Sequence, residues 1–238
     1  MGRNNLIGAA LLALLMTNQA SAQEADPEKA AVPSAGAAQA AVPEKAPEPS
    51  TSVKGTAAPS GRITAPPLAE MSEAQLAEYE RSTKAFGAPL GPRIPLLNSP
   101  DVLTAWSEMQ NALTKSALPH KLREVAILAV ARTWKSEFLW YVHAEEARKD
   151  GISPAAVEAI RGGKKPVFTT PDEDVVYRYA HELSTTHQVS DSAYNAAWKL
   201  LGTRSLVDLT VLLGHYTSVS MTLNAHRLPL PDGVAPIF

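Results

Sequence analysis

The 238-residue sequence contains no cysteine. It can therefore form no disulfide, offers no thiolate ligand to a metal, and has neither a cysteine nucleophile nor a cysteine for a lipid anchor. An excess of charge of one sign is also lacking, because 22 Lys and Arg residues stand against 24 Asp and Glu residues, a formal net charge of -2. This balance gives no electrostatic footprint for nucleic acid. We therefore expect no nucleic-acid partner.

The first 22 residues have the three parts of a secretory signal peptide. Arg3 supplies the positive charge, residues 6–16 form an apolar run, and Ala20-Ser21-Ala22 fits the small-x-small cleavage rule. The alternative is an uncleaved membrane anchor, although a spanning helix needs about 20 apolar residues. We predict cleavage after Ala22, no stable membrane insertion, and a periplasmic or secreted mature protein.

Residues 23–67 are rich in Ala, Pro, Glu and Ser and contain few large apolar side chains. Such a segment cannot bury enough surface to offset its ordering entropy, so we predict a disordered linker. From residue 68 the composition changes, and the rest of the chain is long enough for one domain with its own core. The predicted organisation is a signal peptide over 1–22, a linker over 23–67 and a folded domain over 68–238.

Start and stop signals for helices divide this domain into a series of helical segments. Ser-Pro or Thr-Pro opens some of them, and glycine closes others. No segment alternates with the period of a strand, and no Asn-Gly or Asp-Gly turn joins two β-rich runs. We therefore predict an all-α helical bundle. The predicted helices cover 72–87, 99–115, 119–134, 136–150, 153–162, 170–186, 190–202 and 205–226.

Two of the predicted helical stretches, 122–134 and 206–223, are apolar on nearly every face. A helix of this kind lies in a protein core or at a subunit interface. The presence of two such helices in one domain favours a homo-oligomer.

Glu124 and His143 are the first candidates for chemistry. Glu124 lies in an apolar stretch, where a carboxylate must reach solvent, pair with a base or be desolvated. A tight turn near Lys135 predicts an antiparallel helix hairpin that brings Glu124 and His143 to similar heights. Together they form an acid–base couple. The alternative is structural, with Glu124 paired to Arg123 or Lys121 and His143 a satisfied core histidine.

Other notable residues have structural alternatives as well. His215 and Tyr216 lie in an apolar stretch, where they either join a pocket or pack with a hydrogen bond. The tryptophans are expected in the core or at an interface, and 162–165 (Gly-Gly-Lys-Lys) is expected to be a loop without phosphate-loop spacing. No two histidines have the i, i+4 spacing of a helical metal site, so no bound metal is expected.

The stretch LREVAILAVARTWKSEFLWYVHAEEARKDGIS resembles the signature of the carboxymuconolactone decarboxylase family, which includes the AhpD-like alkylhydroperoxidases. The resemblance lies in an Arg-Glu pair that opens an apolar helix and in the W-x-x-H-x-x-x-A segment that follows. The stretch DLTVLLGHYTSVSMTLNAHRLPLP is similar to the family's closing segment with its tyrosine and Leu-Asn. The likeness covers residues 95–232 and implies an AhpD-like fold and a trimer-based homo-oligomer.

The resemblance assigns Glu124 and His143 to the family's helix-borne glutamate and histidine, which makes them the candidate catalytic pair. The peroxidase branch has a C-x-x-C pair where this sequence has Ser136 and Leu139, so peroxide reduction by the thiol route is excluded. Many decarboxylase-like members have Glu at the position of Leu139, and its loss removes a second carboxylate. Glu137 is a poor substitute because it lies about 200° around the helix.

The family resemblance implies cofactor-independent acid–base decarboxylation or isomerisation of a small organic acid or lactone, the work of a lyase that uses no metal or organic cofactor. His143 then donates a proton and Glu124 sets its protonation state. The candidate substrate-binding residues are Arg123, which holds a carboxylate, and Trp140, His215 and Tyr216.

A non-catalytic role is the alternative function. In it the chain is a helical homo-oligomer that binds a small ligand or serves the cell envelope. Leu139 and the predicted export both favour this alternative.

Overall fold

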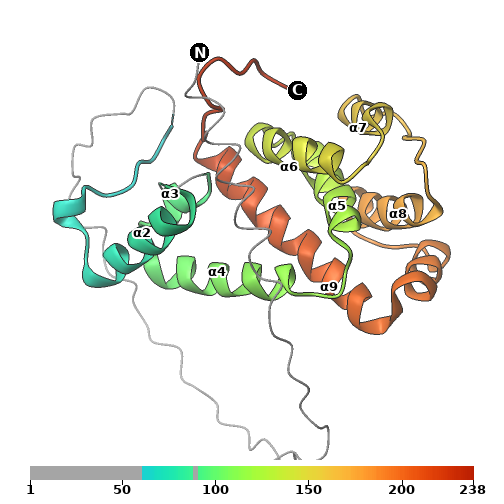
Figure 1. Ribbon diagram of the computed structural model, residues 1–238, viewed down its shortest axis with the longest axis horizontal. Coiled ribbons are helices and arrows are strands. Elements are labelled where there is room, and N and C mark those ends of the chain that lie inside the picture. The colour runs from blue at the N-terminus through green and yellow to red at the C-terminus, as the bar shows by residue number, and fades with distance from the viewer. Residues whose placement is uncertain (1–60, 88–90) are drawn as a thin grey trace, which may run out of the picture. The chain divides into compact units, whose positions relative to one another are not determined.

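Helices are the only regular secondary structure in residues 61–87 and 91–238, the part of the chain that the computed structural model describes. The predicted all-α class is therefore confirmed for this part (Figure 1). The predicted signal peptide over 1–22 and residues 23–60 of the predicted linker lie outside it. For residues 61–67 the prediction of a disordered linker is wrong, because the Arg62 backbone N–H donates to the His226 carbonyl at 2.8 Å and the Thr64 carbonyl accepts from Asn98 Nδ2 at 3.0 Å. The elements are η1 (Leu68–Glu70), α2 (Glu73–Phe86), α3 (Arg93–Leu96), α4 (Pro100–Thr114), α5 (His120–Thr133), α6 (Glu137–Lys149), α7 (Pro154–Arg161), α8 (Pro171–Thr186) and α9 (Asp191–Ala225).

Serine caps begin several helices where the sequence predicts them. Before α2, the Ser72 hydroxyl accepts the backbone N–H of Gln75, and the Gln75 side chain accepts the N–H of Ser72, which completes a capping box. Ser153 and Ser190 accept the N–H three residues further on at the starts of α7 and α9. Gly87 ends α2 in the left-handed conformation, with φ of 80°.

Two predicted boundaries differ from the structure. The four-residue helix α3 was not predicted, because the proline-containing stretch that forms it is too short for a periodic signal. The sequence also predicted separate helices over 190–202 and 205–226, with Ser205 as a cap. The predicted break is confirmed, because α9 consists of two helices that meet at a kink at Gly202 (φ 72°, ψ 171°), but Ser205 is a buried residue within the second helix and not its cap.

The main core is built around α5, which contacts α6, α7, α8 and α9 (Figure 1). Residues 124–131 of α5 are all buried, as its apolar faces predict. Most of the core side chains are aliphatic, and they come from every helix that touches α5. This arrangement leaves Glu124 buried on an otherwise apolar stretch of α5, beside α6.

A smaller cluster of Met71, Leu97 and Leu103 packs near α2, α3 and α4. Trp106 on α4 packs against both this cluster and the main core, so it links the two. Trp140 is buried as expected, but Trp134 and Trp198 are exposed in this chain. Both clusters lie in one compact unit, residues 57–238.

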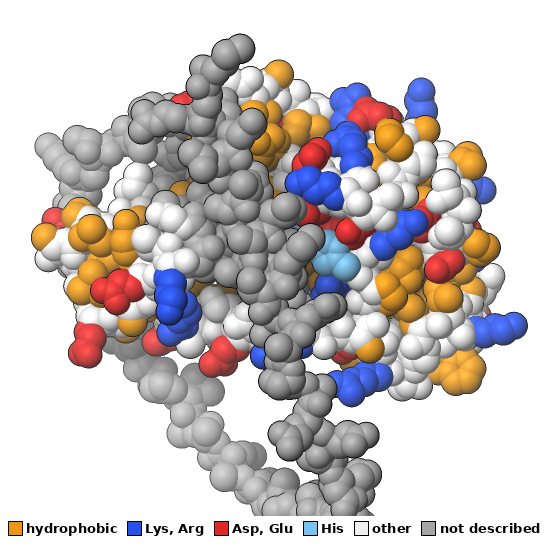
Figure 2. All heavy atoms as spheres, in the orientation of Figure 1, with side chains coloured by type: hydrophobic (Ala, Val, Ile, Leu, Met, Phe, Trp, Pro, Cys, Tyr) orange, Lys and Arg blue, Asp and Glu red, His pale blue; other side chains and the backbone are white. Residues whose placement is uncertain are grey.

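The described surface mixes charges of both signs. On the face seen in Figure 2, basic and acidic side chains lie among one another, without a large area of one sign. No helix of the described ranges is long and apolar enough to cross a membrane.

Candidate acid–base site

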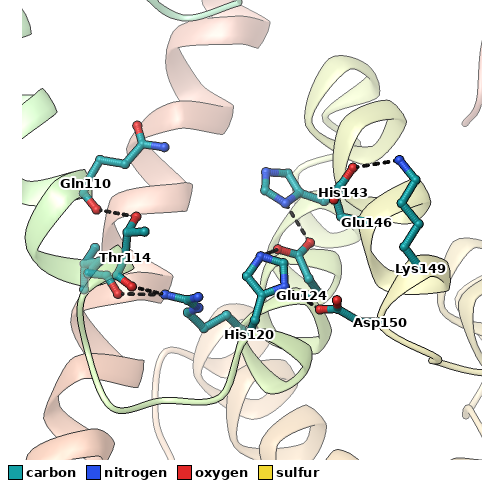
Figure 3. Close-up of polar contacts among 10 residues, drawn as sticks. Gln110, Thr114, His120, Glu124, His143, Glu146, Lys149 and Asp150 are labelled. Carbon is teal, nitrogen blue, oxygen red and sulfur yellow. Dashed lines mark hydrogen bonds and ion pairs between the residues drawn. The ribbon is translucent and has the colours of Figure 1, made fainter. Parts of the chain in front are cut away.

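A tight connection between α5 and α6 forms the predicted hairpin. Lys135 takes a left-handed conformation with φ of 45°, and the backbone N–H of Ser136 donates to the Ala131 carbonyl across 2.9 Å. The two helices pack side by side on either side of this turn. As a result, His143 Nδ1 lies 2.8 Å from Glu124 Oε2 (Figure 3). The predicted meeting of these two residues is confirmed.

The contact continues on the far side of the carboxylate. His120 Nε2 lies 3.6 Å from Glu124 Oε1, an ion-pair distance that is too long for a hydrogen bond. The other ring nitrogen of His120, Nδ1, hydrogen-bonds the carboxylate of Asp150. Asp150, His120, Glu124 and His143 therefore form one row of alternating carboxylates and imidazoles (Figure 3).

Solvent exposure falls along this row towards Glu124. The His120 side chain is 30% exposed, the Glu124 side chain only 4%, and the His143 side chain 15%. The row thus connects a buried carboxylate to the protein surface. His143 Nε2 has no hydrogen-bond partner among the described residues, so this nitrogen is free to meet a ligand.

The alternative partners predicted for Glu124, Lys121 and Arg123, form no ion pair with it. Lys121 instead contacts the buried carboxylate of Glu173 on α8. Arg123 donates to the carbonyls of Leu113 and Thr114, at 3.1 and 2.8 Å, and so binds the free end of α4. Burial lowers the pKa of Arg123, although the nearby Glu124 opposes this shift.

On its other side His143 meets α9. The Tyr216 ring stands edge-on to the His143 ring, with centroids 5.1 Å apart and an interplanar angle of 86°. Burial of the hydroxyl, together with the Glu124 charge, raises the pKa of Tyr216. Tyr216 is therefore a neutral phenol next to the acid–base pair, able to donate a hydrogen bond.

Tyr216, His215 and Trp106 form an aromatic wall that extends from His143 towards α3 and α4. The His215 ring lies 5.1 Å from Trp106, and the guanidinium of Arg93 sits 4.9 Å above the same tryptophan. Burial, helped by the Arg93 charge, lowers the pKa of His215 to about 4. Burial also lowers the pKa of Arg93 to about 10. The His215 Nε2 atom is buried with no hydrogen-bond partner among the described residues.

Trp140 is placed differently from the other predicted substrate-binding residues. It packs in the core with its ring edge-on to Phe238, at a centroid distance of 5.4 Å, and makes no ring contact with the histidines of the row. Arg123 lies beside Glu124 in sequence but is engaged with α4, as described above. Of the predicted substrate-binding residues, Tyr216 contacts the His143 ring, and His215 contacts the Tyr216 ring.

The positions of the family's thiols are buried. Ser136 and Leu139 both lie in the interior, and the Ser136 hydroxyl has no hydrogen-bond partner among the described residues. Glu137 cannot take the place of a carboxylate at position 139. Its two oxygens accept the backbone N–H groups of Ile237 and Phe238, at 2.9 and 3.2 Å, and so bind the C-terminal segment.

Sequence reasoning missed His120 and Asp150. His120 begins α5 and Asp150 follows α6, so each lies fifteen residues from Lys135 on either side of the hairpin turn. The i, i+4 spacing of His120 and Glu124 on one helix is the signal that could have found the first of them. Within residues 61–87 and 91–238, no group of three or more His, Cys, Asp or Glu is arranged to hold a metal ion.

Solved structures with a similar fold come from proteins described as AhpD or as peroxidase-related. One is the alkylhydroperoxidase AhpD core of a peroxidase-related protein from Ralstonia eutropha JMP134, with 16% identity, 74% of this chain and 95% of that chain covered, and a TM-score of 0.60. Another, a peroxidase-related protein from Silicibacter sp. TM1040, has 14% identity, coverage of 76% and 96%, and a TM-score of 0.59. A third, a putative antioxidant defence protein AhpD from Agrobacterium tumefaciens, has 19% identity, coverage of 57% and 94%, and a TM-score of 0.51.

At these identities the likeness establishes the fold. No curated relative matches the chain in sequence. The family model that does match is that of the carboxymuconolactone decarboxylase family, over residues 100–182, which include α5, α6 and the whole row from His120 to Asp150. The helical domain described here thus matches the carboxymuconolactone decarboxylase family model over residues 100–182, has an AhpD-like fold and contains no cysteine.

Proposed function

We propose that this protein is a cofactor-independent acid–base enzyme that decarboxylates or isomerises a small organic acid or lactone. The observation that carries the proposal is the 2.8 Å contact between His143 Nδ1 and the buried Glu124 carboxylate. This contact fixes the ring of His143 and leaves Nε2 as the nitrogen that meets a substrate. A histidine oriented by a carboxylate is a recurrent general acid or base.

In the decarboxylation step, the bond between the substrate carbon and its carboxylate breaks and CO₂ leaves. The electron pair stays on the substrate and is delocalised as a dienolate. Protonated His143 then gives its Nε2 proton to carbon, while Glu124 balances the positive charge of the imidazolium before the transfer. His120 and Asp150 connect the pair to solvent, from which the proton is replaced.

The substrate is bound, in this proposal, by groups on α9. Tyr216 donates its hydroxyl to the dienolate oxygen, since its raised pKa keeps it protonated. His215 offers its unpartnered buried Nε2 to a polar group of the substrate. Arg93 adds positive charge near this wall. Arg123 and Trp140 contribute indirectly to the Glu124–His143 pair, Arg123 through its charge and Trp140 through its packing in the core.

The test is turnover with carboxymuconolactone and a panel of small lactone acids, followed by CO₂ release and by ultraviolet absorbance. Wild-type protein should release CO₂ from at least one compound, and folded His143→Ala protein should not. Activity that survives in folded His143→Ala protein overturns the acid–base mechanism.

The alternative function is a non-catalytic helical protein that binds a small ligand. The burial of Leu139, at the position where many relatives carry a carboxylate, favours it. Wild-type protein that binds a lactone acid by calorimetry, yet neither releases CO₂ nor isomerises it, supports this alternative over the enzyme.

We also propose a homo-oligomer, in keeping with the family's trimers. On α9, Val207, Val211, Gly214, Ser218 and Met221 recur at alternating spacings of four and three and are all exposed, with Val207 at 56% and Met221 at 51%. Such a narrow stripe of apolar and small residues is typical of a helix that packs against another helix. Light scattering should therefore give a multiple of the monomer mass.

The matched variants for this proposal carry the same change at two exposed valines. Val211→Glu, within the stripe, should dissociate the oligomer, because it would bury a charge in the contact. Val167→Glu lies outside the stripe, at a residue that is 83% exposed, and should leave the mass unchanged. A wild-type monomer at micromolar concentration contradicts the proposal.

Export completes the proposed function. The predicted signal peptide gives a mature chain that begins at Gln23 in the periplasm or outside the cell. Mass spectrometry of the native protein should find this N-terminus. Intact Met1 in a cytoplasmic fraction contradicts export.

A further inference from the structure

A second candidate site lies on α8, away from the acid–base row. A pocket of about 540 Å³ opens between the C-terminal part of α5, the loop at 163–165 and one face of α8. Neither Glu124 nor His143 lines this pocket. Its volume falls within the range that small-molecule sites occupy.

The pocket has an excess of positive charge. Arg132, Lys164, Lys165 and Arg178 line it, against two carboxylates, Asp174 and Glu182. Both carboxylates already have partners. Asp174 lies 3.1 Å from Arg178, and Glu182 accepts the backbone N–H of Ser190 at 2.8 Å.

Three cations are left over. Among the described residues, no carboxylate lies within 4.0 Å of Arg132, Lys164 or Lys165. These three cations outnumber the one carboxylate of the pocket that has no ion-pair partner in the described part of the chain, Glu182, so the hollow has a net positive charge that attracts an anion.

Arg132 is held in place by its surroundings. Its guanidinium stacks over the Phe238 ring, 5.6 Å from the centroid, and its buried Nε has no hydrogen-bond partner among the described residues. Gly163 takes φ of 67°, and a Cβ there would lie 2.8 Å from Arg132 Nη2. The missing side chain is what allows the loop with the two lysines to approach this arginine.

An aromatic pair forms part of the wall next to these cations. The Tyr177 and His181 rings, one turn apart on α8, stack with centroids 5.5 Å apart and an interplanar angle of 8°. The site therefore offers both charge and apolar surface to a ligand.

We propose that this pocket binds a small anion through Arg132, Lys164 and Lys165, with carboxylate or phosphate as the group that it recognises. Arg132 supplies a planar guanidinium, which matches either group by paired hydrogen bonds. The two lysines supply point charges from the adjoining loop.

The experiment is calorimetric titration of the purified protein with inorganic phosphate and, separately, with succinate. Succinamide, which has the same skeleton without charge, serves as the neutral comparison. At least one anion should bind, succinamide should not, and added KCl should weaken binding by screening the charges. If only phosphate binds, the ligand is a phosphate compound. If only succinate binds, the ligand is an organic acid.

Two variants locate the binding. Lys164→Gln/Lys165→Gln changes only exposed residues and should weaken binding about tenfold or more, as expected for lost charge-assisted contacts. Arg132→Gln should do the same. The matched control, Lys115→Gln/Lys199→Gln, removes two exposed lysines outside the pocket and should bind like wild type.

The proposal is overturned if neither anion binds, or if the Lys164→Gln/Lys165→Gln variant binds as tightly as wild type. Glu124→Gln protein separates this site from the proposed catalytic pair. Because Glu124 is not part of the pocket, anion binding should persist in that variant even when turnover is lost.

Discussion

Glu124 and Glu173 are two carboxylates buried in the same core but held by opposite kinds of partner. Glu124 lies between the imidazole rings of two histidines, His120 and His143. Glu173 is fully buried against Lys121, and its Oε2 accepts the backbone N–H of Thr169 at 3.1 Å. The side chains of Lys121 and Glu124 leave one helix, α5, three residues apart.

The difference in partners separates a structural carboxylate from a reactive one. Burial alone would raise the pKa of Glu173, but Lys121 and the backbone N–H groups of Thr169 and Thr170 outweigh it and lower this pKa below its ordinary 4.5. Glu173 therefore stays ionised and joins α8 to α5. Glu124 instead has imidazole partners and a row that leads to solvent, so its environment suits proton transfer.

The largest expected effect is on turnover at Glu124. Glu124→Gln keeps the shape of the side chain but removes its charge, and it should lower kcat/KM by about 100-fold or more, as for loss of a general acid–base group. The double variant with His143→Ala should be no worse than either single variant, because the two groups act together.

Glu146→Gln is the matched control for Glu124→Gln. Glu146 is another buried carboxylate, on α6, and its only ion pair in the described structure is with Lys149, at 3.1 Å. This variant should keep the turnover of wild type. Equal losses in Glu124→Gln and Glu146→Gln would erase the distinction between the two kinds of carboxylate.

The next effect is on stability at Glu173. Lys121→Met leaves the Glu173 carboxylate buried without its cation, which should lower the free energy of unfolding by about 3–5 kcal/mol. Lys121→Met/Glu173→Met should recover most of this loss, because replacing both charges with apolar groups is often neutral. Chemical denaturation measures both, and turnover per folded molecule should not change.

The same carboxylate also predicts a pH dependence. Since its folded-state pKa is below 4.5, Glu173 stabilises the protein fully above that value and progressively less as the pH falls below it. Glu173→Gln protein should therefore lose less stability than wild type between neutral pH and pH 3. A wild-type stability that is flat through this range contradicts the role given to Glu173.

A smaller effect is expected at the outer end of the row. His120 touches Glu124 but lies away from Tyr216 and His215, so it positions the pair instead of reacting. His120→Ala should lower kcat about tenfold, a fraction of the loss of a general acid–base group, and shift the pH profile while leaving KM unchanged. Asp150→Asn should act in the same way, and the two changes together should not add.

His187→Asn serves as the control for His120→Ala, because His187 is an exposed histidine at the end of α8 and outside the row. It should leave both kcat and the pH profile unchanged. An unaltered pH profile in His120→Ala would mean that His120 has only a structural role.

The sequence predicted the inner half of the row and missed the outer half for a physical reason. Glu124 and His143 could be paired because a short turn fixes how two helices pack. The two residues lie at similar distances from that turn, on either side of it. His120 and Asp150 stand at helix ends, where polar residues usually face solvent, so the only local signal was the i, i+4 spacing of His120 and Glu124. Their equal distance from Lys135 predicts a contact only once the two helices are known to pack as a hairpin.

The anion pocket likewise could not be predicted from the sequence, because it depends on contacts between more distant segments of the chain. Residues 162–165 were predicted to be a loop without phosphate-loop spacing, and they do form a loop. The pairing of this loop with Arg132 and α8 depends on packing between segments far apart in the chain, which no local pattern records. Helix caps are local, by contrast, and most of the helix boundaries were therefore predicted correctly.

The smallest expected effect is that the His215 side chain does not take up a proton in mild acid. This prediction extends the comparison from buried carboxylates to buried histidines. His143 has a carboxylate beside it, whereas His215 is buried next to Arg93 and Trp106, with a pKa lowered to about 4. His215 should therefore keep the NMR signature of a neutral ring down to about pH 5, with its signals assigned by their loss in His215→Gln protein. As the pH falls from 6.5 towards 4, the unfolded chain binds a proton at this histidine and the folded protein does not, so His215 lowers stability in this window. The stability of His215→Gln protein should accordingly fall less steeply with acid than that of wild type. If His215 instead titrates near pH 6.5, its ring is solvated, and its proposed place in the substrate-binding wall is lost.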